Sequence, residues 1–178
     1  MKTDAELMMD FKAGDTAAFE MLVRRHEVGL VNFFYRLLWD RAAAEDQTQE
    51  VFLRLFTHVA EYEPRAKFTT YLYRVITRLC IDRSRKKQPV YTNDLPACGT
   101  PTSSPVEAAE RRERDAVVRA ALARLPGSQR MAVVLRYYEG LSGAEIAAAM
   151  GTSVRAVERL LARGRTGLEQ ELADFLGK

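Results

Sequence analysis

Residues 141–165 read LSGAEIAAAMGTSVRAVERLLARGR, the pattern of two helices joined by a tight turn. Ser142 and Glu145 have the S-x-x-E spacing of a capping box, which starts a helix. Gly151 follows the apolar positions of that helix, where the chain must turn and a residue that tolerates positive φ is favoured. Ser153 can cap the next helix, which has basic residues near its start. The stretch therefore predicts a helix-turn-helix whose second helix enters a DNA groove.

Two faces can be assigned along that second helix. The apolar positions recur at helical spacing and predict its buried side: Val157, Leu160, Leu161 and Leu168. The outer side holds Arg155, Ala156, Glu158, Arg159, Ala162 and Arg163. An arginine can donate two hydrogen bonds to guanine or bind phosphate, and the sequence leaves open which contact each one makes. We expect Glu158 to pair with an arginine, with acceptance from cytosine and discouragement of nonspecific DNA binding as the alternatives.

The rest of the chain is also helical in its pattern. Apolar residues recur at spacings of three, four and seven in residues 17–38, 42–60 and 68–85. Helices of this length can bury one another's faces in a compact bundle. The next stretch, residues 88–105, holds four of the six prolines and one charged residue. Such a composition is typical of a flexible linker.

Two further helices are predicted before the helix-turn-helix, over residues 106–124 and 128–138. A serine–proline pair marks the start of the first, and a proline–glycine pair separates the two. The sequence thus predicts an all-α fold of two small helical domains, residues 1–87 and 106–178, joined by a flexible linker over residues 88–105.

Charge is distributed unevenly around a net value of +3. Residues 1–64 hold 7 basic and 12 acidic residues, whereas residues 65–87 hold 8 basic residues and one acid. The start of the last helix is basic as well. Two separated basic surfaces indicate contact with nucleic acid at two places.

Several function classes find no support in the residues. No apolar run approaches the roughly 20 residues that cross a bilayer, and the N-terminus lacks the apolar core of a secretory signal. Cys80 and Cys98 are too few for a disulfide framework, and neither they nor His26 and His58 have metal-ligand spacing. We find no phosphate loop and no nucleophile–base pairing. We therefore expect a cytoplasmic protein with no catalytic residue, metal, cofactor, membrane insertion or small-molecule substrate.

Residues 61–87 combine a loop, aromatic residues at the start of a helix and a row of cations along it. Aromatic rings beside a basic track suit single-stranded DNA, because bases stack on the rings while the cations follow the backbone. An extruded base could occupy a loop pocket. A core helix with a solvated basic face is the alternative interpretation. The aromatic residues are Phe68, Tyr71 and Tyr73, and the cations are Arg74, Arg78, Arg83, Arg85, Lys86 and Lys87.

Four segments together resemble the extracytoplasmic-function sigma factors, small bacterial sigma factors that keep only the domains called region 2 and region 4. The segments are GDTAAFEMLVRRH, AAAEDQTQEVFLRLF, FTTYLYRVITRLCIDRSRK and LARLPGSQRMAVVLRYYEGLSGAEIAAAMG. They stand in the family's order and spacing over residues 4–172, the linker excepted. The resemblance implies a subunit that binds core RNA polymerase and directs initiation at selected promoters.

The resemblance also implies three contact surfaces. The clamp helices of the largest polymerase subunit would bind Glu45, Asp46, Gln49, Glu50 and Phe52, with Phe56 adding apolar contact. The −10 promoter element would bind Glu61, Tyr62, Pro64, Lys67, Phe68, Tyr71, Arg74, Arg78, Arg83 and Arg85. The −35 element would bind Arg155, Ala156, Glu158, Arg159 and Arg163. The flap region of the polymerase and an anti-sigma factor are the further partners that the family implies.

Some of these assignments have alternatives. The residues proposed to bind the clamp helices, called the acidic set below (Glu45, Asp46, Gln49, Glu50 and Phe52), can instead belong to an ordinary amphipathic helix with a solvated acidic face. Tyr71 stands where many members have tryptophan, so the role in stacking is kept but the strength of promoter melting is open. Arg78 stands where many have asparagine, so the base read at the −10 element is open. We expect Arg130 and Arg136 to lie on solvated faces, with phosphate contact as the alternative.

Two other functions compete with that of a sigma factor. A helix-turn-helix regulator would bind duplex DNA without polymerase, but it needs neither the acidic helix nor the basic-aromatic stripe. A sigma-like decoy would sequester an anti-sigma factor, but it would be expected to lose the basic residues of both DNA surfaces.

Overall fold

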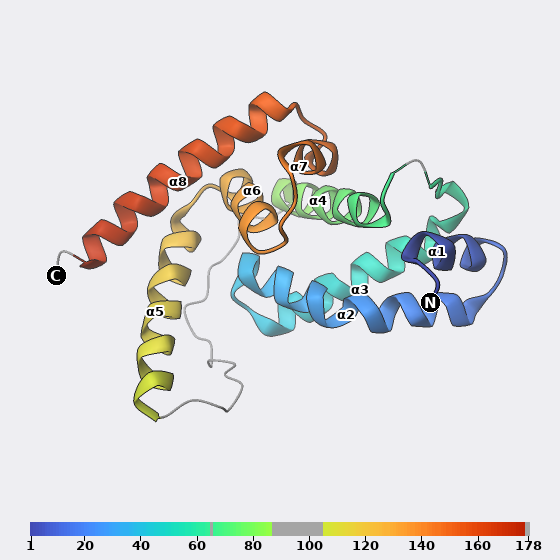
Figure 1. Cartoon of the computed structure of the whole chain (residues 1–178), viewed down its shortest axis with the longest axis horizontal. Helices are drawn as coiled ribbons and strands as arrows, with labels where there is room; N and C mark the ends of the chain where they lie inside the picture. Colours follow the sequence, from blue (N-terminus) through green and yellow to red (C-terminus); the bar gives the residue numbers. More distant parts are fainter. Residues whose placement is uncertain (65, 87–104, 177–178) are drawn as a thin grey trace.

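The structure, a computed structural model, describes residues 1–64, 66–86 and 105–176. Every regular element within those residues is a helix, so the predicted all-α fold is confirmed (Figure 1). The first part comprises α1 (Asp4–Lys12), α2 (Thr16–Leu38), α3 (Arg41–Thr57), the 3-10 helix η1 (Val59–Glu61) and α4 (Phe68–Lys86). The second comprises α5 (Pro105–Arg124), α6 (Gly127–Tyr137), α7 (Gly143–Met150) and α8 (Val154–Leu176).

Most of the predicted helices are found with boundaries shifted by one or two residues. The helix expected over residues 42–60 ends earlier, at Thr57, where the chain tightens into η1. The helix expected to read DNA extends well past Arg165, to Leu176. These differences concern where helices end, which local sequence determines least well.

The short helix α1 was not predicted. Thr3 caps it and Glu6 completes the capping box, with the Glu6 carboxylate 2.6 Å from the Thr3 backbone nitrogen. Leu7, Met8 and Phe11 then bury its apolar side against α2. The mixed charge of the N-terminus hides this pattern, but the T-x-x-E spacing was a usable signal.

A tight turn folds α3 back along α2. Trp39 ends α2 in the left-handed conformation, at φ 58°, and Asp40 caps α3 by accepting from the backbone of Ala43 at 3.0 Å. The left-handed region is uncommon for a residue with a bulky side chain, so packing must hold Trp39 there. Its indole lies beside Arg119 of α5, whose guanidinium is 5.8 Å from the ring.

Two glycines allow α8 to approach its neighbours closely. A Cβ atom at Gly164 would lie 2.8 Å from a methyl group of Val133, and one at Gly167 would lie 2.8 Å from a methyl group of Leu125. Gly151 ends α7 at φ 63°, which confirms the conformation predicted for the turn. The second domain is therefore built around α8, with α5, α6 and α7 along it.

The two domains pack against each other. Helix α4 lies against α7, and α6 lies against α2 (Figure 1). One continuous buried cluster contains Phe33, Phe34 and Ile76 from the first domain together with Leu135 and Ile146 from the second. The chain is thus described in a closed arrangement, which the sequence did not indicate.

Candidate nucleic-acid and partner interfaces

The start of α8 has the solvent-facing surface that the sequence predicted. The hydroxyl of Ser153 accepts from the backbone nitrogen of Ala156 at 3.2 Å and so caps the helix. Val157 is fully buried beneath it. The residues proposed for the −35 element point outward, with Ala156 half-buried and the others exposed: Arg155, Glu158, Arg159 and Arg163.

The expected salt bridge of Glu158 is not found. No acceptor bond or ion pair of Glu158 occurs within the part of the chain that the structure describes, although the neighbouring arginines are included. Long exposed side chains gain little from pairing in water, because the ordering cost offsets the attraction. The four charged side chains of this face therefore remain independent of one another.

Helix α4 turns its aromatic residues inward and its cations outward. Phe68 is 4% exposed and packs near the His26 ring, with 5.4 Å between ring centroids. Arg74 and Arg78 are exposed, and Tyr71 is half-buried. In this arrangement the alternative interpretation fits better, since the helix has a core face and a solvated basic face. The side chains of Arg83 and Arg85 lie outside the described part, as does Cys98.

A tyrosine of the loop before α4, Tyr62, is buried within the protein. Tyr62 is 1% exposed and packs edge-on against Tyr71, with 4.9 Å between centroids. Its hydroxyl has no hydrogen-bond partner among the described residues. Burial raises the pKa of Tyr62. Glu61, Pro64 and Lys67 are exposed around it. The Tyr62 ring is therefore not a free stacking surface here.

The second domain contacts the loop and α4 through three polar pairs. The Lys67 ammonium lies 3.0 Å from the Glu145 carboxylate. The Tyr73 hydroxyl donates to Glu139 at 2.6 Å, and the Thr77 hydroxyl donates to the Ala149 carbonyl. Burial, with the Glu139 bond adding to it, raises the pKa of Tyr73 far above its usual range.

Glu145 has two roles at once. Its carboxylate accepts from the backbone and hydroxyl of Ser142, which confirms the predicted capping box, and it also binds Lys67. The Ser142 backbone N–H, then the Ser142 hydroxyl and Lys67, lower the pKa of Glu145 to about 2. The group that starts α7 is thus also a contact between domains.

The prediction for Arg130 is wrong. Arg130 is 3% exposed, and its guanidinium donates to the carbonyls of Leu37, Ala123 and Leu125 at 2.8, 2.8 and 3.0 Å. Those carbonyls lie at or just beyond the ends of α2 and α5, where helices leave acceptors unsatisfied. Arg136 is exposed as expected, although it donates to the Leu141 carbonyl at 3.0 Å.

The acidic set on α3 is accessible. Glu45, Asp46 and Gln49 are exposed, while Glu50 and Phe52 are half-buried. Glu45 pairs with Arg41 at 2.9 Å one turn earlier on the helix, a contact that contributes little in water. Leu53 and Phe56 beside this set are 56% and 49% exposed. The surface offers both acidic and apolar groups to a partner.

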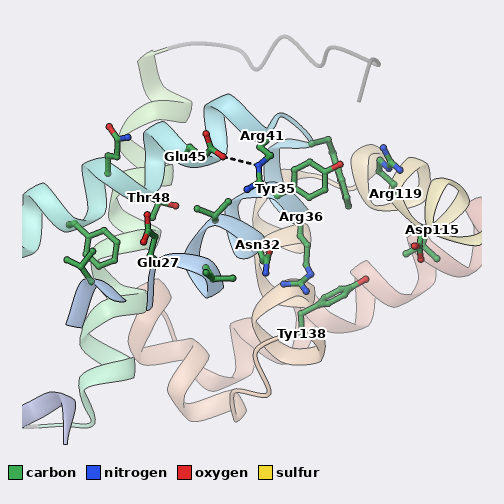
Figure 2. Close-up of a pocket in the computed structure, with 17 residues that line it drawn as sticks. Glu27, Asn32, Tyr35, Arg36, Arg41, Glu45, Thr48, Asp115, Arg119 and Tyr138 are labelled. Carbon is green, nitrogen blue, oxygen red and sulfur yellow. Dashed lines mark hydrogen bonds and ion pairs between the residues drawn. The ribbon is translucent and has the colours of Figure 1, made fainter. Parts of the chain in front are cut away.

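A groove of about 1260 Å³ runs between α2, α3 and α5. Figure 2 shows Arg36 and Tyr138 facing each other along one side, with Asp115 and Arg119 entering from α5. The Arg36 guanidinium lies 4.6 Å from the centre of the Tyr138 ring. Three residues of the acidic set also line this groove: Glu45, Gln49 and Phe52.

The described residues hold neither a metal-binding cluster nor a membrane-spanning helix. Residues 1–64, 66–86 and 105–176 contain no group of three or more histidine, cysteine, aspartate or glutamate side chains placed to hold a metal ion. No helix in the same residues combines the length and apolar character needed to span a membrane. His26 instead bonds to the Asp4 carboxylate, at 2.8 Å.

Comparison with known proteins gives concordant matches. The family description "Sigma-70 region 2" matches residues 22–90, and "Sigma-70, region 4" matches residues 115–168. The ECF RNA polymerase sigma factor SigW of Bacillus subtilis is 32% identical over 175 residues, which cover 92% of this chain and 94% of SigW. The ECF RNA polymerase sigma factor SigE of Mycolicibacterium smegmatis is 36% identical over 172 residues, covering 93% and 65% respectively.

Two solved structures share the fold. CnrH, solved in complex with the cytosolic domain of CnrY, superposes with a TM-score of 0.73 at 24% identity, covering 97% of this chain and 99% of CnrH. The sigma factor RpoE of Bartonella quintana, solved with the anti-sigma factor NepR, gives 0.69 at 19% identity, covering 86% and 96%.

Proposed function

Because the chain belongs to the extracytoplasmic-function group of the sigma-70 family, we propose that it binds core RNA polymerase and directs initiation at promoters that carry −35 and −10 elements. The observation that carries this proposal is the exposed basic start of α8 in the same chain as the exposed acidic face of α3. The chain acts in stoichiometric amount in the cytoplasm, and the polymerase performs the chemistry.

The −35 contact belongs to the first turns of α8. A helix that begins at a capped, exposed turn can enter the major groove, where its first residues reach base edges. Arg155, Arg159 and Arg163 provide guanidinium groups, and Ala156 leaves room for close approach. Glu158, which has no pairing partner among the described residues, is available to accept from a base or to repel phosphate.

The core contact belongs to α3. Glu45, Asp46, Gln49 and Glu50 give a negative surface suited to a basic partner, and charge complementarity of this kind raises the rate of association. Phe52 and the exposed Phe56 add apolar area at its edge. The flap region of the polymerase is the proposed partner of the second domain.

The −10 contact belongs to the loop before α4 and to α4 itself. Arg74 and Arg78 are exposed and can follow a phosphate backbone. Tyr62, Phe68 and Tyr71 form the aromatic cluster beside them. In the closed arrangement this cluster is packed, so stacking on a base requires the loop to rearrange.

An anti-sigma factor is a further proposed partner. The groove of Figure 2 spans both domains, so a polypeptide seated in it would cover Glu45, Gln49 and Phe52 and hold the domains closed. Such a partner would block polymerase binding by occupying the docking surface.

Transcription from purified components tests the proposed function. We expect the chain, added to core polymerase with fragmented genomic DNA, to start transcripts at a discrete set of positions. The Arg155→Ala, Arg159→Ala, Arg163→Ala triple variant should lose these starts, whereas Arg24→Ala, an exposed arginine on α2, should keep them. Core binding without any discrete start would contradict the proposal, and specific duplex binding without polymerase would favour an ordinary helix-turn-helix regulator.

A decoy would behave differently in the same experiment. If the chain only sequestered an anti-sigma factor, the triple variant and the unaltered chain would be equally silent in transcription and equally able to bind that partner.

A further inference from the structure

The N-terminal helix α1 is connected to both ends of the loop between η1 and α4. The ammonium of Lys12, the last residue of α1, donates to the backbone carbonyl of Tyr62 at 2.8 Å, across 50 positions of sequence. At the other end of the loop, Phe68 packs near the His26 ring, which the Asp4 carboxylate binds at 2.8 Å. The one helix that the sequence did not reveal therefore contacts the loop that is proposed to take the −10 strand.

The Tyr62 carbonyl has its partner outside the loop. Helical hydrogen bonding ends at Tyr62, whose backbone N–H donates to the Val59 carbonyl at 3.1 Å, and resumes where the backbone of Thr70 donates to the Lys67 carbonyl at 3.0 Å. Tyr62 is 1% exposed, and a backbone carbonyl removed from water is costly unless it accepts a hydrogen bond. Lys12 suits this role, because its long side chain carries a charged donor from one element to another.

Helix α1 is itself held firmly against the bundle. Arg25 of α2 donates to the Asp4 carboxylate at 2.8 Å. Three apolar side chains of α1 are buried on the side that faces α2: Leu7, Met8 and Phe11. Lys12 follows directly after this buried side. The backbone of Lys12 is therefore fixed relative to α2, and the bond to Tyr62 extends that restraint to the start of the loop.

The Tyr62 ring, in contrast, is held by packing alone. Its hydroxyl bonds to none of the described residues, and the ring packs edge-on against Tyr71 and Phe68, with 4.9 and 6.5 Å between centroids. The ring can turn away from these neighbours without breaking a side-chain hydrogen bond, while the backbone bond to Lys12 is kept. A loop with a fixed backbone and an unbonded ring can admit a base without losing its shape.

We propose that α1 is a positioning element of the −10 surface and that Lys12 is its positioning residue, which holds the loop backbone at Tyr62 while the tyrosine ring turns aside for a base. This inference rests on the proposed function, because it concerns the residue that shapes the same surface. Order that exists before the strand arrives lowers the cost of binding. It also sharpens the choice between bases, because a loop that can shift accommodates the wrong base as well as the right one.

The ratio of initiation between templates separates positioning from direct DNA contact. A lysine that bound phosphate would raise initiation on every template alike, because phosphate carries no sequence information. A lysine that shapes the loop changes the ratio between the preferred base and the others. The experiment therefore uses the full chain with core polymerase on one promoter mapped by the transcription test, with each position of its −10 element changed in turn to the other three bases.

Two substitutions of Lys12 and one matched control are compared. Lys12→Met keeps the side-chain length but removes the donor, whereas Lys12→Arg keeps a charged donor. Lys2→Met removes the same charge beside the same helix, where the Lys2 ammonium pairs with Asp10 of α1 at 2.8 Å. We expect Lys12→Met to lower the ratio between the preferred base and the others by about tenfold. Lys12→Arg should restore the ratio, and Lys2→Met should leave it unchanged.

Hydrogen exchange of the free chain gives a second readout, which does not depend on transcription. Backbone amides of residues 58–64, followed by mass spectrometry, should exchange faster in Lys12→Met than in the unaltered chain, because the restraint on the loop is lost. The same amides should exchange at the unaltered rate in Lys12→Arg and Lys2→Met. Both lysines are exposed, so circular dichroism should show the same helix content in all three variants.

The outcomes distinguish a failed inference from a failed function. A Lys12→Met variant whose loop exchanges at the unaltered rate, or whose loop exchanges faster while the base ratio is kept, overturns the inference. An equal loss from Lys2→Met would assign the effect to net charge, and a uniform fall on every template would assign it to phosphate contact; either result also overturns it. If the unaltered chain itself starts no transcript with core polymerase, the proposed function fails, and the role of Lys12 at the −10 element fails with it.

Discussion

Arg130 shows how a single side chain can join helices that are distant in sequence. Its guanidinium donates hydrogen bonds to backbone carbonyls at the ends of α2 and α5. Arg130→Met keeps the side-chain length but leaves those buried acceptors unpaired. We expect the free energy of unfolding to fall by about 2–4 kcal/mol, measured by urea denaturation.

Arg136→Met is the matched control for that measurement. Arg136 is exposed and makes one bond to the Leu141 carbonyl, so its loss should cost less than about 1 kcal/mol. Equal effects of the two substitutions would show that Arg130 does not hold the helix ends together.

Tyr62 gives a prediction of the opposite sign. Its buried hydroxyl has no partner among the described residues, so it loses its hydration without compensation. Tyr62→Phe should therefore raise the free energy of unfolding, by about 0.5–1 kcal/mol. Tyr137→Phe, at a side chain that is 64% exposed, should leave it unchanged. A destabilised Tyr62→Phe variant would indicate that the hydroxyl is bonded in solution.

Glu145 gives the chain a pH dependence that can be isolated. Its pKa is lowered from 4.5 to about 2 in the folded protein, so the ionised form stabilises the fold at pH values above 4.5. That stabilisation is lost as the pH falls from 4.5 toward 2. The difference in Tm between the unaltered chain and Glu145→Gln should therefore become smaller as the pH falls from 4.5 toward 2. A difference that stays constant with pH would contradict the assignment.

At the scale of elements, the glycines of α8 fix how closely the helices of the second domain pack. Gly164→Ala would place a methyl group 2.8 Å from Val133. We expect a loss of about 1–3 kcal/mol in unfolding free energy, since overpacking forces neighbours apart. Gly29→Ala, in the middle of α2 with nothing within 4 Å, should instead stabilise by about 0.5–1 kcal/mol. Thermal unfolding of both variants checks the sign of each effect.

The helices themselves were largely predictable, because their signals are local. The capping boxes, the turn glycine at position 151 and the apolar spacing of α2 and α4 all act within a few residues. Trp39 was not predictable as a left-handed residue, since tertiary packing and not its own preference holds it there. The short helix α1 escaped notice because its apolar side spans only three buried residues: Leu7, Met8 and Phe11.

The candidate surfaces were predictable to different degrees. The outward face of α8 follows from helical periodicity, and its residues lie where the sequence indicated. The packing of Tyr62 and Phe68 did not follow, because the sequence does not say which aromatic residues have core neighbours. Arg130 was misassigned for the same reason: its carbonyl partner at Leu37 lies 93 positions away.

At the scale of the whole molecule, the shared core predicts how the chain unfolds. Buried side chains of both domains form one cluster, so the domains should lose structure together. We expect the urea transitions measured by helical circular dichroism and by Trp39 fluorescence to coincide. In Glu139→Ala the fluorescence transition should move to lower urea than the circular dichroism transition. Separate transitions in the unaltered chain would mean that the domains are already apart in solution.

The closed arrangement also has a consequence for how the protein is made. Thr77 lies on α4, but its partner carbonyl belongs to Ala149, which the ribosome reaches only after 72 further residues. At about 5–20 residues per second, that interval lasts roughly 4–14 s. Throughout it, the nascent chain carries α4 without the helix that later covers it. Each newly synthesised molecule therefore passes through an uncovered state once, whatever the balance between open and closed forms in the finished protein.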